Sequence, residues 1–178
     1  ASTFPLAVPL EWNLLFCYGA IFLFLGFPGW DGYALTDIAT GWTETCTVKS
    51  KGERIVAAGL DQLINRFPFL ILGIHSDNGS EFINHHLARY CELRQITFTR
   101  GRPSHSNDQA HIQQKKWSIV RRNVGYYRYD TPRELDLLNQ LWPLVSIQTN
   151  LFLPQQRLIS KTRTGARVQK RHDTAATP

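Results

Sequence analysis

Between residues 33 and 149, short apolar or β-branched runs alternate with segments of helical spacing. This alternation limits what the chain can fold into more than any other feature. The apolar run FLILGIH at 69–75 has the length of a buried strand, and an Asn-Gly turn follows it. A helix capped by Ser80 is predicted through Leu93, and ITFTR at 96–100 is expected to be the next strand. Strands that alternate with helices favour an α/β domain with a mixed sheet.

The flanking segments extend the same pattern. Residues 33–49 contain two β-rich runs around an Ala-Thr-Gly turn, which predicts a hairpin. Helical spacing of apolar residues over 51–67 predicts a helix that ends before Pro68. A basic helix is expected after the Gly/Pro/Ser/Asn loop at 101–107, and another over 131–149, where Thr131 caps and Pro132 takes the first helical position. The tail from Leu153 onward is basic and has little periodicity.

The N-terminal segment from Trp12 to Trp30 contains no charged residue and approaches the length of a membrane span. However, glycines and a proline interrupt it, and the flanking charges, Glu11 and Asp31, are both acidic. We therefore expect no membrane segment here, but buried strand material or sequence from a damaged reading frame. The expected division is an aberrant hydrophobic segment at 1–30, an α/β domain at 31–150 and a basic tail at 151–178.

The three cysteines, Cys17, Cys46 and Cys91, are widely spaced and form no Cys-x-x-Cys pair. Neither a disulfide framework nor a zinc site is indicated. Reduced thiols are the default for such a chain, which favours a cytoplasmic location.

Basic residues are concentrated in two stretches. The chain has a net charge of +6, and residues 100–128 hold seven Lys or Arg against one acid, Asp108, which is expected to cap a helix. Residues 157–172 hold six and no acid. A polyanionic partner such as DNA and a merely solvated basic face are both compatible with this distribution.

Several motifs agree, in order and spacing, with a known family. GIHSDNGSEFIN at 73–84, NDQAHIQQKKW at 107–117, LTDIATGWTE at 35–44 and the basic KTRTGARVQKRHDT at 161–174 carry the likeness. They resemble the catalytic core of retroviral integrases and of the DDE transposases of bacterial insertion sequences. The resemblance covers residues 35–178 and implies a ribonuclease-H-like mixed β-sheet flanked by helices. It also implies DNA as the partner and leaves a homo-oligomer possible.

The resemblance implies a metal site made by three carboxylates, Asp, Asp and Glu, that hold Mg2+ or Mn2+ for phosphoryl transfer. Asp77 matches the second Asp and is the metal-binding candidate. The family Glu often follows with thirty-five residues between, and at that spacing this chain has Gln113. Residues 12–30, where the first Asp is expected, contain no acid, and Asp31 fits that position poorly.

DNA contacts are expected from six residues of the basic stretch, Arg100, Arg102, Lys115, Lys116, Arg121 and Arg122, since cations beside a phosphate backbone give affinity without sequence information. On the same helix, Gln113, Trp117, Val120 and Val124 form one stripe that is expected to face the core.

The leading interpretation is an integrase-core transposase-like protein, truncated or degenerate, whose ancestral metal-dependent strand transfer is impaired. Two alternatives stay open. One is a non-catalytic DNA-binding remnant of a transposase, and the other is an active nuclease or transposase that recruits another acid such as Asp31.

Overall fold

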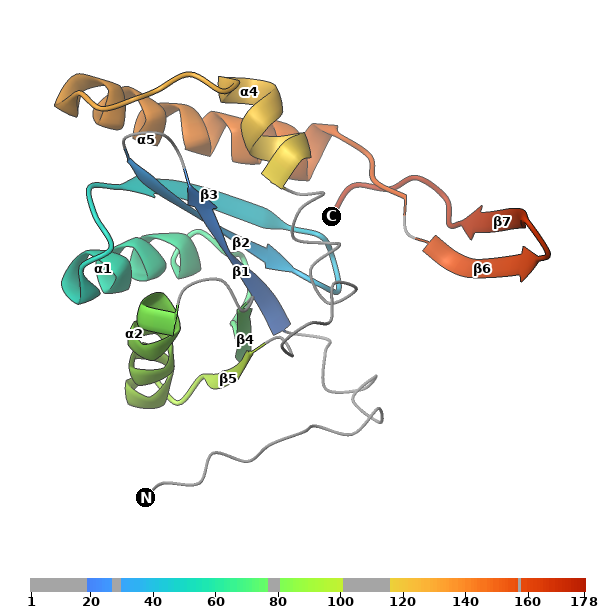
Figure 1. The fold of residues 1–178 in the computed structure, drawn as a ribbon, viewed down its shortest axis with the longest axis horizontal. Helices are drawn as coiled ribbons and strands as arrows, with labels where there is room; N and C mark the ends of the chain where they lie inside the picture. Colours follow the sequence, from blue (N-terminus) through green and yellow to red (C-terminus); the bar gives the residue numbers. More distant parts are fainter. Residues whose placement is uncertain (1–18, 27–29, 77–80, 101–115, 157) are drawn as a thin grey trace.

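Five strands form one mixed sheet in the order β3-β2-β1-β4-β5 (Figure 1). The strands are β1 (Gly19–Gly26), β2 (Asp31–Asp37), β3 (Thr43–Val48), β4 (Gly73–Ser76) and β5 (Thr97–Arg100). β1, β2 and β3 are antiparallel neighbours, whereas β1, β4 and β5 run parallel. The computed structural model describes residues 19–26, 30–76, 81–100, 116–156 and 158–178.

β1 is the central strand, and it comes from the charge-free N-terminal segment. It pairs over Ala20–Gly26 with Asp31–Asp37 of β2, and over Gly19–Phe22 with Gly73–Ser76 of β4. These pairings place both sides of the expected boundary at residue 30 in one sheet. Within the described residues, no helix is both long and apolar enough to cross a bilayer.

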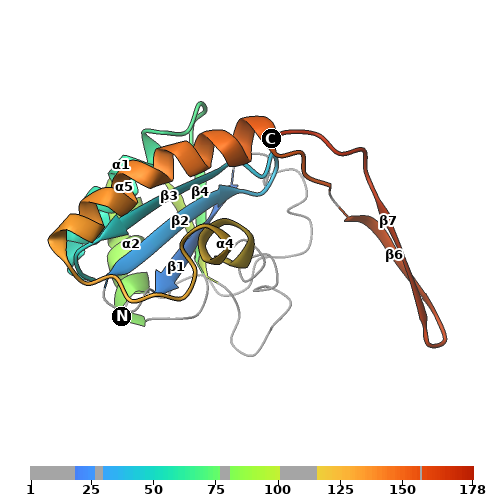
Figure 2. The same ribbon diagram turned by 90° about the horizontal axis from the view of Figure 1, so that it is seen from above.

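Helices α1 (Glu53–Ile64) and α2 (Glu81–Leu93) cover one face of the sheet (Figures 1 and 2). Tyr33 and Leu35 of β2 point to this side and pack in a core with Leu60 and Leu63 of α1 and Leu87 of α2. Ala34, between them in sequence, faces the other layer, as the two-residue repeat of a strand requires.

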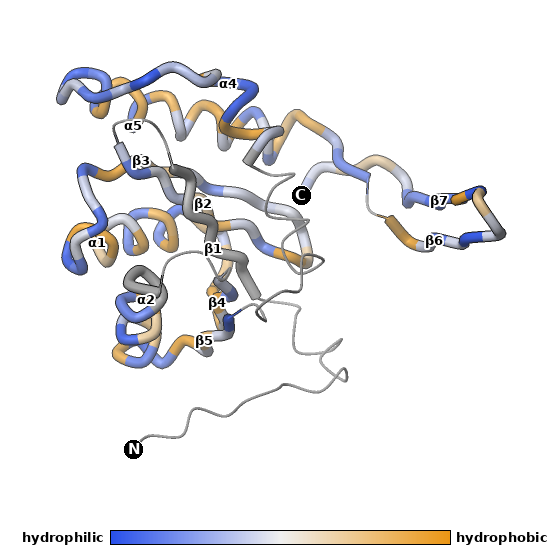
Figure 3. The backbone as a smooth tube through the Cα atoms, viewed as in Figure 1, coloured by the Kyte–Doolittle hydropathy of each residue, from blue (hydrophilic) through white to orange (hydrophobic). Residues whose placement is uncertain are grey.

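The opposite face is covered by α5 (Pro132–Ile147) together with a helical turn that comprises η4 (Lys116–Arg121) and α4 (Arg122–Val124) (Figure 2). Trp142 of α5 is fully buried here, and its indole Nε1 donates to Thr47 Oγ1 of β3 at 2.7 Å. A second π-helical turn, η5 (Gln148–Phe152), continues α5. The sheet therefore lies between two helical layers (Figure 3 shows the hydropathy along the chain).

The predicted start of α5 is confirmed in detail. Thr131 Oγ1 accepts from the Glu134 backbone N–H at 3.3 Å, while Glu134 Oε2 accepts from the Thr131 N–H at 2.9 Å. This reciprocal capping box, with Pro132 following, satisfies donors that a helix N-terminus leaves unpaired. The four residues from Thr131 to Glu134 therefore determine where α5 begins.

Side chains from α5 and η5 cover the outer edge of β3. Asn139 accepts from Thr47 N at 3.0 Å and donates to Thr47 O at 2.9 Å, and Asn150 makes the same pair of bonds with Thr43 at 2.9 and 3.0 Å. Between them, Arg66 of the α1–β4 connection donates to Thr45 O at 3.1 Å. An edge strand bonded in this way offers few free groups to another strand.

The predicted 33–49 hairpin, 51–67 helix, helix through Leu93 and 96–100 strand are confirmed with small changes of boundary. β4 is shorter than the predicted 69–75 and begins later, at Gly73. Trp117 corrects the expected core stripe: Val120 and Val124 are buried, but Trp117 is 61% exposed. The i→i+5 bonds of a π-helix widen the turn, so residues three apart no longer share a face as they do in an α-helix.

The basic tail contains regular structure that its sequence pattern did not predict. β6 (Leu158–Thr164) and β7 (Arg167–His172) form an antiparallel hairpin, and every residue in both strands is exposed. The two chain segments at its base are joined by a bridge in which Gln155 N donates to Ala176 O at 2.8 Å and Ala176 N to Gln155 O at 3.1 Å. The hairpin extends away from the α/β body in both views (Figures 1 and 2).

Candidate functional site

The C-terminal end of β4 is the expected position of a binding site, because ligands of open α/β sheets bind at the carboxyl ends of parallel strands. Ser76 is the last residue of β4, and Asp77 follows it in the sequence but lies outside the described residues. His75 of β4 has its Nδ1 2.9 Å from Thr99 Oγ1 of the neighbouring β5, so this imidazole is held against the adjacent strand.

β1 and β5 both lie beside this end of β4, and β1 contains no carboxylate. Its residue Phe22 is in register with Ser76, and the whole strand reads GAIFLFLG. A carboxylate metal pair needs hard oxygen donors from more than one element. Among the described residues, no group of three His, Cys, Asp or Glu is placed to hold a metal ion. Of the elements expected to carry ligands, β1 is therefore the one that the structure describes, and it supplies no side-chain oxygen toward the divalent metal pair that the resemblance implies.

Asp31, the first residue of β2, lies beside the C-terminal end of β1. It pairs with Gly26, four residues along the strand from Phe22, which corresponds to about 13 Å. Asp31 Oδ1 is 3.9 Å from Lys51 Nζ, and burial raises the pKa of its carboxyl while the lysine opposes that rise. Recruitment of Asp31 into a metal site with Asp77 stays a prediction, because Asp77 lies outside the described residues.

Two other acids in the β2–β3 hairpin have structural partners. Asp37 is buried, and its Oδ2 accepts from both the backbone N and the Oγ1 of Thr40 at 2.7 Å, which closes the turn between the strands. Glu44 is also buried and accepts from Trp42 Nε1 at 2.9 Å. Burial raises the pKa of Glu44, which favours its protonated form. Both groups hold the hairpin together.

The predicted DNA-contacting residues lie on different elements. Arg100 ends β5 and is exposed, and Arg122 is exposed in α4. Arg121 is engaged locally: one guanidinium nitrogen donates to Gly125 O at 3.2 Å, and the group lies 4.5 Å from the centre of the Tyr126 ring. Lys116 begins η4. Asp77, Arg102, Gln113 and Lys115 lie outside the described residues.

The sheet separates these cations. α4 packs on Ala34 of β2, and β1 and β4 lie between β2 and β5, where Arg100 is found. η4, which contains Arg121, also contacts β1, so two to three strand spacings of about 4.8 Å separate the two regions. The structure does not bring Arg100 beside Arg121 and Arg122.

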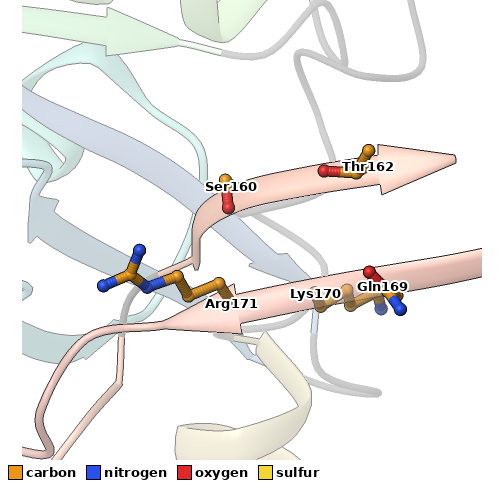
Figure 4. A pocket seen from close by; sticks show the side chains of 5 residues that line it. All are labelled: Ser160, Thr162, Gln169, Lys170 and Arg171. Carbon is orange, nitrogen blue, oxygen red and sulfur yellow. The ribbon is translucent and has the colours of Figure 1, made fainter.

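The β6–β7 hairpin forms a basic surface that the candidate residues did not include. An open hollow on it is lined by Ser160, Thr162, Gln169, Lys170 and Arg171 (Figure 4). The turn sequence carries the signal that identifies the hairpin: Gly165 has a φ of 62° and directly follows β6. A Gly in this conformation at the first turn position is typical of a two-residue hairpin turn, because a side chain there would be strained.

Comparison with known proteins identifies the fold as similar to an integrase catalytic core. The catalytic core domain of BIV integrase superposes with a TM-score of 0.55 and 20% sequence identity, over 76% of this chain and 84% of that domain. At this identity the likeness concerns the fold alone. It supports the coarse fold prediction made from the sequence motifs.

Sequence comparisons add two matches. The chain is 42% identical over 144 residues to "Uncharacterized protein y4rM" from Sinorhizobium fredii (strain NBRC 101917 / NGR234). The aligned region covers 81% of this chain. The chain spans about two fifths of that relative's length, 41%. Residues 1–63 match a family model described as "Transmembrane protein of unknown function (DUF3556)". In this same stretch, β1, β2 and β3 form neighbouring strands of one sheet and α1 packs on it.

Proposed function

We propose that this protein is a DNA-directed member of the integrase-core (DDE) transposase type in which metal-dependent strand transfer is impaired. The fold supports the type, and the likeness of residues 73–84 and 107–117 to transposase motifs supports the DNA partner. The observation that carries the proposal is the position of β1. This strand lies parallel to β4, its Phe22 is in register with Ser76 at the end of β4, and none of the eight residues of β1 is acidic.

The chemistry of the donor set explains the impairment. Asp77 is an anionic oxygen donor, but Gln113 offers only a neutral amide oxygen at the spacing where the family has Glu. A hard cation such as Mg2+ binds carboxylates and phosphate oxygens in preference to neutral donors. With one carboxylate in place of three, the affinity for a divalent metal falls.

A strand-transfer assay tests the proposal. The whole chain is incubated with Mg2+ or Mn2+ and a labelled linear duplex, and joined products are separated on a denaturing gel. We expect no products from the wild-type chain or from Gln113→Glu alone, because β1 still supplies no acid. Products from the wild type that disappear in Asp77→Ala would refute the impairment.

The alternative function, a non-catalytic DNA-binding remnant, is separated from the first by a second variant. Gln113→Glu is combined in turn with Ile21→Asp, Phe22→Asp and Leu23→Asp, the β1 positions around the end of β4. Strand transfer recovered by any of these combinations favours an enzyme that has lost two ligands. DNA binding without recovered activity in all of them favours the binding remnant, and no DNA binding at moderate salt contradicts both functions.

A further inference from the structure

The β6–β7 hairpin has two faces of different chemistry. Directly opposed residues of an antiparallel pair project from the same face of the ribbon. The pairs Ser160–Arg171, Thr162–Gln169 and Thr164–Arg167 therefore form one face, here called the polar face. The pairs Lys161–Lys170 and Arg163–Val168 form the other, here called the cationic face.

The hairpin carries a charge pattern that is unfavourable for the hairpin alone. Lys161 and Lys170 stand directly opposite each other, and like charges in this position destabilise a strand pair. Residues 158–172 contain no Asp or Glu that could compensate them. A two-stranded hairpin exposed on both faces is also marginally stable in water. A polyanion bound to the hairpin would remove the repulsion and cover the exposed surface.

Dimensions decide which polyanion fits. The six to seven residues of each strand extend over roughly 20 Å, and the two backbones lie about 4.8 Å apart. The major groove of B-form DNA is about 12 Å wide and 8.5 Å deep and admits a two-stranded ribbon. The major groove of an A-form RNA duplex is too narrow for side chains to enter. Duplex DNA is therefore the matching partner.

The polar face has the groups that contact base edges. Gln169 and Thr162 lie at its centre, where amide and hydroxyl groups can donate to and accept from bases. Arg167 and Arg171 lie on either side of them, four residues apart, at about 13 Å along the strand. The hollow lined by Ser160, Thr162, Gln169 and Arg171 belongs to this face, with Lys170 beside it (Figure 4).

We propose that the β6–β7 hairpin docks in the major groove of duplex DNA, with the Thr162–Gln169 face toward the base edges and Lys161 and Lys170 toward the flanking phosphates. A ribbon that lies inside a deep groove has phosphates on both sides, within reach of long lysine side chains. The inference rests on the proposed DNA-directed function and assigns it a surface separate from the β4 end of the sheet.

Salt dependence of DNA binding tests the cationic face. Binding of the whole chain to a fluorescent 24-base-pair duplex of mixed sequence is measured by anisotropy at several salt concentrations. Lys161→Ser with Lys170→Ser should lower the slope of log K against log salt by about 1.8, since each phosphate contact contributes about 0.9. The matched control, Lys49→Ser with Arg54→Ser, removes the same charge from exposed positions before and within α1 and should leave the slope near that of the wild type. Equal losses in both double variants would overturn the proposal.

Groove occupancy tests the polar face. Duplex loaded with methyl green, which occupies the major groove, should bind the chain more weakly than duplex loaded with distamycin, which occupies the minor groove. This difference should shrink in Thr162→Ala with Gln169→Ala, whose salt slope stays unchanged. Competition by distamycin alone, or equal affinity for a double-stranded RNA of the same sequence, would overturn the proposal.

The outcomes separate the hairpin from the function as a whole. A wild-type chain that binds DNA while the Lys161–Lys170 variant binds equally well contradicts the hairpin and leaves the proposed function standing. A wild-type chain that does not bind duplex DNA contradicts both. Because the substituted side chains are exposed, and because replacing Lys161 and Lys170 removes a repulsion, the variants should unfold at or above the temperature of the wild type, which excludes misfolding as the cause of a loss.

Discussion

Asn150 gives the sharpest test of how the edge of the sheet is protected. Its side chain is fully buried; Oδ1 accepts from the Thr43 N–H at 2.9 Å, and Nδ2 donates to the Thr43 carbonyl at 3.0 Å. In Asn150→Ala the carbonyl keeps the Ser146 hydroxyl as a donor at 3.3 Å, but the N–H loses the acceptor recorded for it. Thr43 is itself buried, so water does not replace that acceptor at the same site.

The expected cost follows from the buried N–H group. A buried donor left unsatisfied costs about 1–3 kcal/mol. We therefore expect Asn150→Ala to lower the free energy of unfolding by about 2 kcal/mol, which in a domain of this size corresponds to a Tm lower by roughly 4–8 °C. Urea unfolding followed by circular dichroism measures the change. The freed edge of β3 should also make the variant associate more readily at high concentration, which light scattering detects.

Asn150→Asp is the matched control. It keeps an oxygen for the Thr43 N–H but puts a second oxygen against the Thr43 carbonyl and near Glu44 Oε1, which lies 3.5 Å from Asn150 Nδ2 in the native chain. This variant should be less stable at neutral pH than at acidic pH, where a proton restores the donor. If Asn150→Ala unfolds within 0.5 kcal/mol of the wild type, the edge argument is wrong, since that is the ordinary scatter of surface substitutions (about ±0.5 kcal/mol).

Three further predictions concern stability and reactivity. Burial raises the pKa of Glu44, so this side chain contributes to folding stability below its unfolded pKa, and the contribution is lost as pH rises through its folded pKa. Glu44→Gln keeps an acceptor for Trp42, and in thermal melts it should stabilise the fold at pH 7 and give no gain near pH 3. Thr131→Ala should lower the free energy of unfolding by about 1 kcal/mol, whereas Thr131→Ser, which keeps the hydroxyl, should recover most of it. Cys46 and Cys91 are buried and their pKa values are raised to about 12, so a thiol reagent should modify them only after urea unfolding; fast modification of the folded chain at pH 8 would contradict their burial.

The order of strands and helices after residue 33 could be predicted from the sequence because burial leaves a periodic pattern. In β2, Tyr33 and Leu35 face one core and Ala34 faces the other, and α1 presents Val56, Leu60 and Leu63 to one side at helical spacing. Thr131 and Glu134 predict the start of α5 because the capping box is a local interaction. The spacing between Asp77 and Gln113 is likewise a property of the sequence alone.

The role of β1 could not be predicted in the same way. A central strand with neighbours on both edges is covered by helices on both faces, so its sequence is a continuous apolar run without alternation. Such a run has the same composition as a membrane segment. The interrupting glycines and the flanking acids argue against a membrane segment, but only the pairing with β2 and β4 makes this run a central strand and places it beside the end of β4.

Local sequence and tertiary structure therefore decided different properties of this protein. The sequence by itself determined the succession of elements, the helix cap and the thirty-five-residue spacing from Asp77 to Gln113, because each depends on near neighbours or on spacing. Only the tertiary structure decided that β1 lies beside β4 without a carboxylate, that Trp117 is exposed, and that the basic tail is a two-faced hairpin. These properties depend on strand pairing and on helical register, and a fully exposed hairpin buries no residues that would mark it in the sequence.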